Sequence, residues 1–307
     1  MKKILFILGF VSLISTSTTA QQMAHFSQYL LNDFFLNPAV AGTKEYSPVR
    51  LTYRAQWAGF EGAPRTASLS FHSNYLNNMG LGGIVVNDRT GPLTQTGLEL
   101  AYSYHIEITD GTKLALGLSA KATQYALDES QITLEDAGDF SFTGITDQTL
   151  IPDAGFGAYL FSEKYFAGLS VPQLFEAKMR YDTDDQKLNK EVRHYYLTGG
   201  YNVAINDDFT VQPSLLVKTV FTAPSTFDLN AKVIYKDMLS LGASYRYKDA
   251  VVVVVGLEKE NFVLGYAYDV TLSNVRRYSG GSHEIVLGYN IADSKKNMGR
   301  KRYSPRM

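Results

Sequence analysis

The chain has 307 residues, a net charge of −1, 21 Tyr, 17 Phe and no Cys. This length suffices for one large β domain or two small ones, and the balanced charge creates no bulk field that would favour nucleic acid or acidic substrates. The absence of cysteine excludes disulfides, thiolate metal sites, a cysteine nucleophile and a lipoprotein anchor.

Residues 1–20 have the pattern of a secretory signal peptide. Lys2 and Lys3 precede an apolar run of eleven residues, Ile4 to Ile14. A helix needs about 20 apolar residues to cross a membrane, so this run is too short. Small residues follow, and we expect cleavage after Ala20; the alternative is an uncleaved anchor. No later stretch reaches about 18 apolar residues, so the exported chain is either soluble or a membrane barrel.

Residues 21–48 lack a strand period but are rich in apolar and aromatic side chains, such as Tyr29, Phe34 and Phe35. Such a segment is too apolar for a free tail. We expect it to fold into or under a barrel as a partial plug. A first strand or a disordered leader are the alternatives.

From residue 49 onward, apolar and polar side chains alternate with a period of two, which is typical of a half-buried strand. In residues 50–57, for example, Tyr53 and Trp57 lie on the opposite face from Arg54. The apolar faces extend over about ten residues, which fits a tilted membrane strand, whereas soluble strands average about five or six residues. Aromatic residues near their ends fit a membrane girdle.

The pattern predicts an all-β fold, an outer-membrane antiparallel β-barrel of about 14 strands over residues 49–291. The predicted strands are 49–58, 64–73, 79–87, 92–108, 112–126, 151–161, 164–172, 191–205, 209–221, 225–235, 239–247, 250–258, 261–271 and 282–291. The longest connections, 127–150, 173–190 and 272–281, are all odd-numbered. With a periplasmic N-terminus, they all lie outside the cell, and the tight turns lie in the periplasm.

Several segments resemble the PorP/SprF family, membrane components of type IX secretion and gliding systems. "HFSQYLLNDFFLNPAVAGT" is similar to the family's N-terminal signature, and "RAQWAGFEGAPRTASLSFHS" is similar to the next one. "VNDRTGPLTQTGLELAYSYHI", "YFAGLSVPQLF", "RHYYLTGGY" and "GYAYDVTLSNVRRYSGGSHEIVLGY" follow in the family's order. Each motif is weak by itself, but the ordered set covers nearly the whole mature chain.

The resemblance implies an outer-membrane barrel that is not an enzyme and carries no cofactor. It implies as partners a secreted, adhesin-like surface protein and the periplasmic or outer-membrane subunits of the secretion system, besides membrane lipid and without nucleic acid. The expected function is to support secretion or surface attachment of that adhesin, with a possible part in gliding motility. A porin or transporter for a small or hydrophobic solute is the alternative.

The residues themselves assign no catalytic, cofactor-binding or metal site. The five histidines are His25, His72, His105, His194 and His283, and no pair has metal-ligand spacing. The best catalytic candidate is Ser103, His105 and Glu107 on one strand face. Alternate strand positions place these side chains in a row rather than in a triad, so we expect hydrogen-bonding roles for them.

Two charged segments remain. Residues 128–153 contain seven acids and no Lys or Arg, which is typical of a solvated acidic loop, with calcium binding or docking of a basic partner as alternatives. The tail, 292–307, has six basic residues and one acid. It either contacts a partner or anionic lipid headgroups, or is solvated.

Overall fold

The computed structural model describes residues 27–76, 78–131, 146–176, 191–221 and 223–292. The predicted signal peptide, His25, most of the acidic loop and nearly all of the basic tail lie outside these residues. Within them, no helix is long and apolar enough to cross a membrane.

The described chain is built from strands joined by turns, preceded by three short 3-10 turns. The turns are η1 (Gln28–Leu30), η2 (Asp33–Phe35) and η3 (Pro38–Val40), with η4 (Glu129–Gln131) and η5 (Asn274–Arg277) later. The strands are β1 (Tyr46–Ala55), β2 (Arg65–Leu76), β3 (Met79–Thr90), β4 (Leu93–Thr109), β5 (Thr112–Asp128), β6 (Thr146–Ser162), β7 (Tyr165–Val171), β8 (Tyr195–Tyr201), β9 (Val203–Ala204), β10 (Phe209–Val220), β11 (Ala223–Tyr235), β12 (Leu239–Arg246), β13 (Ala250–Lys259), β14 (Phe262–Thr271) and β15 (Ser282–Ala292).

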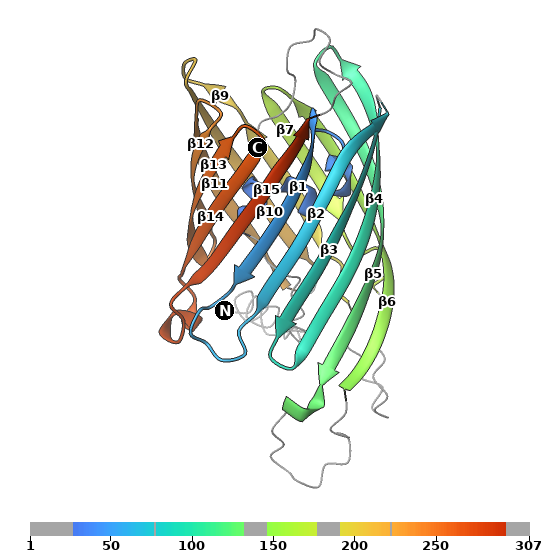
Figure 1. Cartoon of the computed structure of the whole chain (residues 1–307), viewed down its shortest axis with the longest axis vertical. Coiled ribbons are helices and arrows are strands. Elements are labelled where there is room, and N and C mark those ends of the chain that lie inside the picture. Colours follow the sequence, from blue (N-terminus) through green and yellow to red (C-terminus); the bar gives the residue numbers. More distant parts are fainter. Residues whose placement is uncertain (1–26, 77, 132–145, 177–190, 222, 293–307) are drawn as a thin grey trace, which may run out of the picture.

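The strands form one closed antiparallel barrel (Figure 1). Each strand pairs with its neighbours in sequence, and β1 closes the ring by pairing with β15. Tyr53, for example, lies opposite Ala67 of β2 on one side and Ile285 of β15 on the other. β8 and the two-residue β9 both pair with β10 and act as one interrupted strand. The described residues therefore contain fourteen barrel strands, as the alternation predicted.

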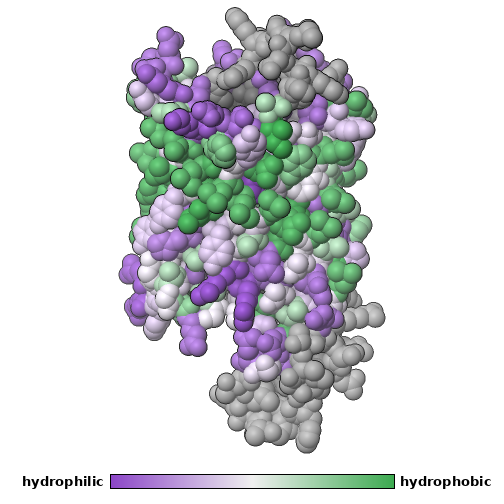
Figure 2. Space-filling model, viewed as in Figure 1, coloured by the Kyte–Doolittle hydropathy of each residue, from purple (hydrophilic) through white to green (hydrophobic). Residues whose placement is uncertain are grey.

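The two faces of each strand differ as expected from their sequence. Leu51 and Tyr53 are exposed on the outside, whereas Arg50, Thr52 and Arg54 are buried on the inside. An apolar band runs around the visible face of the barrel, between hydrophilic zones at its two ends (Figure 2). Because a soluble protein rarely exposes so large an apolar area, this band identifies the surface that contacts lipid.

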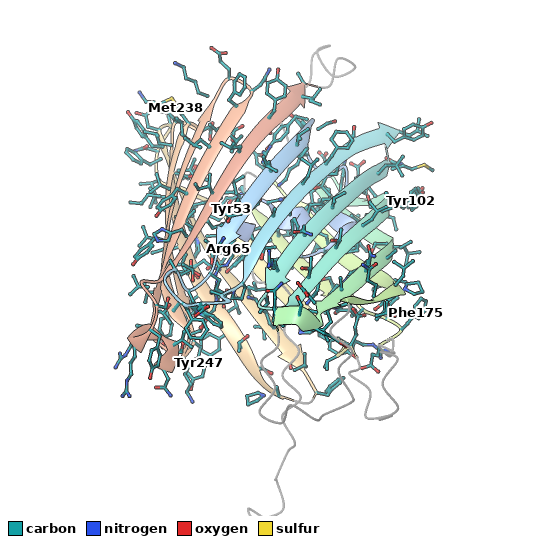
Figure 3. All side chains as sticks on the ribbon, turned by 60° about the horizontal axis from the view of Figure 1, so that its bottom comes forward. Tyr53, Arg65, Tyr102, Phe175, Met238 and Tyr247 are labelled. Atoms are coloured by element: carbon teal, nitrogen blue, oxygen red, sulfur yellow. The ribbon has the colours of Figure 1, made fainter. Side chains whose placement is uncertain are left out.

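Aromatic side chains flank the band at both ends, as a membrane barrel requires at the two lipid–water interfaces. Near one end, Phe209 and Tyr235 pair across neighbouring strands with ring centroids 4.8 Å apart. Near the other end, Phe227 and Tyr247 stack at 4.8 Å. The outward direction of Tyr53, Tyr102 and Tyr247 is visible in Figure 3.

The two rims of the barrel carry connections of different lengths. The rim at which Tyr46 begins β1 and Ala292 ends β15, here the turn rim, is closed by connections of two to four residues. The opposite rim, here the loop rim, carries the four longest connections, which join β1 to β2, β5 to β6, β7 to β8 and β14 to β15, and the short connections that follow β3, β10 and β12. The long connections thus share one rim, as the odd numbering predicted. Outer-membrane barrels place short turns in the periplasm, so the loop rim faces outside.

A test of the lipid face uses Leu264, which lies on the outside of β14 in register with Leu257 and Leu287. We expect Leu264→Arg to lower the stability of the inserted barrel by about 2–4 kcal/mol, because the charge would enter the hydrocarbon layer. Unfolding in detergent or lipid, followed by heat-modifiable migration, measures the effect. Leu264→Met is the control and should change little; equal stability of the two variants would contradict the assignment.

Candidate functional site: an occupied lumen

Residues 27–45, here the plug, run through the interior of the barrel from near the loop rim to the turn rim (Figure 1). Ser27 contacts Arg54 and Asp269, both close to the loop-rim ends of their strands. The segment then makes three 3-10 turns and joins β1 at Tyr46. Phe34, Ala39 and other plug side chains are almost fully buried. The expected partial plug is therefore present, and it lies within the lumen.

Inward-facing glycines make room for the plug on one wall. A methyl group at Gly80 of β3 would lie 2.0 Å from the Ala41 carbonyl oxygen, and one at Gly117 of β5 would lie 2.3 Å from the Ala39 nitrogen. At Gly157 of β6 it would lie 1.9 Å from an oxygen of the Asn37 side chain. Since any larger residue would displace the plug backbone, these glycines permit its close approach.

Polar side chains of the same wall bind the plug backbone. His72 Nδ1 accepts a hydrogen bond from the Gly42 amide at 3.1 Å, and Asn74 Nδ2 donates to the Gly42 carbonyl at 3.2 Å. Asn37, in the plug, donates from Nδ2 to the carbonyls of Ala158 and Leu169 at 3.0 and 3.3 Å. Because the plug has little regular structure of its own, such bonds satisfy its buried polar groups.

The predicted pair Ser103 and His105 belongs to this wall. Ser103 Oγ donates to the Ala41 carbonyl at 2.6 Å, and His105 Nε2 lies 3.0 Å from the same oxygen and 2.9 Å from Ser103 Oγ. The two side chains therefore contact each other. The sequence predicted only that they lie in a row on one face of the strand. Because a carbonyl only accepts, the contact between Nε2 and the Ala41 oxygen is a hydrogen bond in the tautomer that carries the proton on Nε2, and in that tautomer Nε2 is not a base towards Ser103. Glu107 is exposed near the turn rim and does not join them.

The opposite wall holds the first part of the plug. Lys232 of β11 donates from Nζ to the Leu30 carbonyl at 3.1 Å, and Tyr29 OH donates to Asn230 Oδ1 at 2.8 Å. Tyr29 and Leu30 pack in a buried apolar cluster with Leu216 of β10 and with residues of β8, β13 and β14. Within the plug, Lys44 Nζ lies 3.3 Å from Asp33 Oδ2. The plug thus spans the lumen between two facing walls.

A buried ion network fixes the loop-rim end of the plug. Arg54 donates to Glu284 Oε2 at 2.9 Å and to Asp269 Oδ2 at 2.8 Å. Ser27 joins both acids, because its amide donates to Glu284 at 2.7 Å and its hydroxyl donates to Asp269 at 2.7 Å. Arg54 also donates to the Ser27 hydroxyl at 2.8 Å. All of these side chains are nearly inaccessible to solvent.

The network continues along β11 and β12. Arg246 Nη1 lies 3.4 Å from Asp269 Oδ2, and Arg246 Nε lies 3.4 Å from Asp228 Oδ2. Lys218 Nζ of β10 lies 3.6 Å from Asp228. Alternating positive and negative side chains therefore run around part of the inner wall. The alternation predicted that Arg54 lies on the polar face of its strand, but it gave no signal that a network of charged side chains would form at Ser27.

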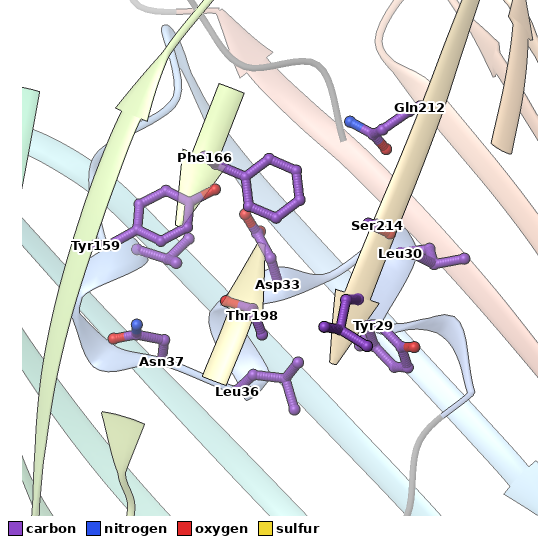
Figure 4. A pocket seen from close by; sticks show the side chains of 12 residues that line it. Tyr29, Leu30, Asp33, Leu36, Asn37, Tyr159, Phe166, Thr198, Gln212 and Ser214 are labelled. Atoms are coloured by element: carbon purple, nitrogen blue, oxygen red, sulfur yellow. The ribbon is translucent and has the colours of Figure 1, made fainter. Parts of the chain in front are cut away.

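A small cavity remains beside the plug (Figure 4). It measures about 30 Å³, space for about one or two water molecules. Its lining comes from Tyr29, Leu30, Asp33, Leu36, Asn37, Val40, Tyr159, Phe166, Thr198, Gln212, Ser214 and Leu215. A second cavity, next to Lys44 and His72, measures about 10 Å³. Neither of these two cavities is large enough for a sugar or a fatty acid.

The described ends of the acidic segment are ordered: Asp128 ends β5, Glu129–Gln131 form η4, and the residues from Thr146 onward belong to β6. β6 begins at Thr146, and Asp153 faces the lumen, where its Oδ1 accepts hydrogen bonds from the amides of Leu174 and Phe175 at 3.0 Å. Glu191, between β7 and β8, accepts a hydrogen bond from Tyr125 OH at 2.5 Å, and burial raises the pKa of its carboxyl. No group of three or more His, Asp or Glu side chains among the described residues is arranged to hold a metal ion.

The fold and its lumen define an outer-membrane β-barrel whose interior is occupied by its own N-terminal segment. The chain belongs to the family of type IX secretion system membrane proteins PorP/SprF, whose model matches residues 18–289. The family and the fold are those of a secretion-system membrane barrel, a non-enzymatic kind of protein, and they place the chain in the outer membrane as a component that works with other parts of that system.

Several solved barrels are similar in fold at low sequence identity. A Pseudomonas aeruginosa FadL homologue is 11% identical with a TM-score of 0.49, over 84% of this chain and 93% of that one. The CymD monoaromatic hydrocarbon channel is 11% identical with a TM-score of 0.46, over 88% and 94%. The KdgM porin is 13% identical with a TM-score of 0.38, over 79% and 98%. No curated protein sequence matches the chain.

The fit of the plug can be tested with two glycines of β3. Gly80 faces the plug, whereas Gly83 faces outward, and a methyl group there would make only ordinary contacts at 3.5 Å. We expect Gly80→Ala to destabilise the plugged barrel by about 1–3 kcal/mol through overpacking and to increase protease cleavage of the plug. Gly83→Ala, the same change on the same strand, should leave both properties unchanged. Equal behaviour of the two variants would argue against close packing of the plug.

Proposed function

We propose that this barrel supports secretion or surface attachment of an adhesin-like partner protein by holding it, rather than by conducting solutes. The observation that carries the proposal is the occupied lumen, because hydrogen bonds from facing walls fix the plug across it. Membership of a secretion-system family supports the same proposed function. A barrel whose lumen is occupied by its own chain would act through its two rims.

The loop rim offers the surface that a secreted partner would meet. Its connections expose aromatic side chains, with Phe175 exposed by 67%, Phe221 by 86% and Tyr278 by 70%. Phe175 points away from the barrel in Figure 3. Aromatic side chains are the residues that most often anchor protein interfaces. Components of the secretion machine would contact the turn rim, which faces the periplasm.

The partner hypothesis predicts the effect of shortening one outer connection. Replacement of residues 132–145 by a short Gly-Ser linker should leave the barrel folded, since loops contribute little to barrel closure. It should reduce the amount of one surface protein on the cell, or increase that protein in the medium. Protein profiles of cells and medium, compared among wild type, loop variant and deletion strain, measure this. Outer-membrane yield and heat-modifiable migration control for folding, and identical profiles in all three strains would refute the proposal.

The occupied lumen predicts the electrical behaviour of the purified protein. The complete protein should show no steady conductance in planar bilayers, because the plug crosses the lumen. A variant that lacks residues 27–45 should conduct, provided that it still migrates as a folded barrel. A stable, solute-selective conductance of the complete protein would instead favour a porin for a small or hydrophobic solute.

A further inference from the structure

Two arginines occupy neighbouring outward-facing positions at the loop rim. Arg65 begins β2 and lies in direct register with Arg89 near the end of β3. Their sequence neighbours Thr66 and Asp88 are buried inside the barrel, where Thr66 Oγ1 donates to Asp88 Oδ1 at 2.5 Å. Because side chains alternate along a strand, this inner contact requires both arginines to face outward. Both are exposed.

Neither arginine forms an ion pair within the described residues, although Arg89 interacts electrostatically with the carboxylate of Asp128. Side chains directly opposite each other in an antiparallel pair have Cβ atoms about 4.5–5.5 Å apart, and like charges at that separation are destabilising. Arg89 makes one long hydrogen bond, 3.4 Å, to the neutral Gln131 amide, and Arg65 makes no ion pair in the described part of the chain. Asp88 is adjacent in sequence but points to the other face.

The pair lies at the loop-rim edge of the apolar outer face of the barrel. Going inward along the outside of the barrel, the next row contains Tyr53, Ala67 and the exposed Asn87, and the row after that contains Leu51, Leu69 and Val85. Aromatic girdle residues mark the lipid–water interface, so cations one row beyond Tyr53 stand where phosphates do. Hydrophilic side chains gather below the apolar band at the lower ends of β2 and β3 (Figure 2).

We propose that Arg65 and Arg89 bind a phosphate group of lipid A, the phosphorylated glycolipid of the outer leaflet. The planar guanidinium presents two parallel N–H donors that match phosphate oxygens, and two of them side by side can hold one phosphate from two directions. Thr94 of β4 lies in register with Arg89 and adds a hydroxyl donor on the same outer face. The outward direction and the depth favour a lipid over a soluble anion.

The site is specific to one rim, which provides a matched control. Lys259 ends β13 on the outside of the barrel at the turn rim and is exposed. It carries the same charge as each arginine but faces the other leaflet. Lys259→Gln therefore removes one outward-facing charge without touching the proposed site.

The experiment uses the full-length protein, extracted and reconstituted with phosphorylated lipid A, and native mass spectrometry counts the lipid that stays bound. Arg65→Gln and Arg89→Gln should each lower lipid A retention by about fivefold, the effect of one basic residue near a charged membrane surface. Lys259→Gln should retain as much as wild type. Lipid A without phosphate should bind no better to wild type than to the variants, and added inorganic phosphate should not displace the lipid.

Other results would overturn the proposal. Equal retention by wild type and the arginine variants, confirmed as folded by heat-modifiable migration, would remove the site. Preference for phosphatidylglycerol over lipid A would place these arginines at the inner leaflet. If lipid A is retained only after residues 132–145 are replaced, the acidic residues of that segment, and not lipid A, bind the two arginines in the wild-type protein. Displacement by inorganic phosphate would indicate a free anion as the ligand.

Discussion

The structure depends on one constraint: the barrel wall must satisfy the backbone of an irregular segment most of whose residues it buries. The hydrogen bonds of the three short turns satisfy only some of the plug's amides and carbonyls, so the others need partners on the wall. His72 and Ser103 supply them on one side, and Lys232 supplies one on the other. The polar side chains on the inner face of the strands therefore bind one particular segment and do not simply line a water-filled channel.

The ion network at Ser27 fixes the position of the plug end more than it adds to the net stability of the barrel. Moving Arg54, Asp269 and Glu284 out of water is costly, and their mutual attraction offsets much of that cost. Breaking such a network by removing one partner leaves an uncompensated buried charge, which typically costs about 3–5 kcal/mol. Because Ser27 bonds to both acids and to Arg54, the plug end has one favourable location.

The sequence predicts the barrel well because each strand can be recognised from the pattern of its own few residues. Alternation along each strand identifies which side chains face lipid, as at Leu51 and Tyr53, and the lengths of the connections predict which rim is which. The strand ends are less predictable: β6 begins at Thr146 rather than at residue 151, since its first residues extend beyond the apolar band.

The contacts inside the lumen could not be predicted from the sequence, because they join residues far apart in it. A period of two places Arg54 and Glu284 inside, yet nothing local relates these residues to Ser27, 27 and 257 positions away from it. Likewise, the sequence shows Gly117 only as a residue that is unfavourable in a strand. The structure explains it, because the plug backbone lies directly against this glycine. Ser103 and His105 were expected to form a row, and only the Ala41 carbonyl explains why they meet.

Barrel closure and plug position are coupled through the same residues. The seam of the barrel lies between β1 and β15, and Ser27 binds Arg54 on one side of that seam and Glu284 on the other. The plug also continues directly into β1, so its far end is fixed by the first strand of the ring. A plug that moved out would leave Arg54, Asp269 and Glu284 without a neighbour that now joins them at the seam. The segment that occupies the lumen therefore also helps to hold the two strands of the seam together.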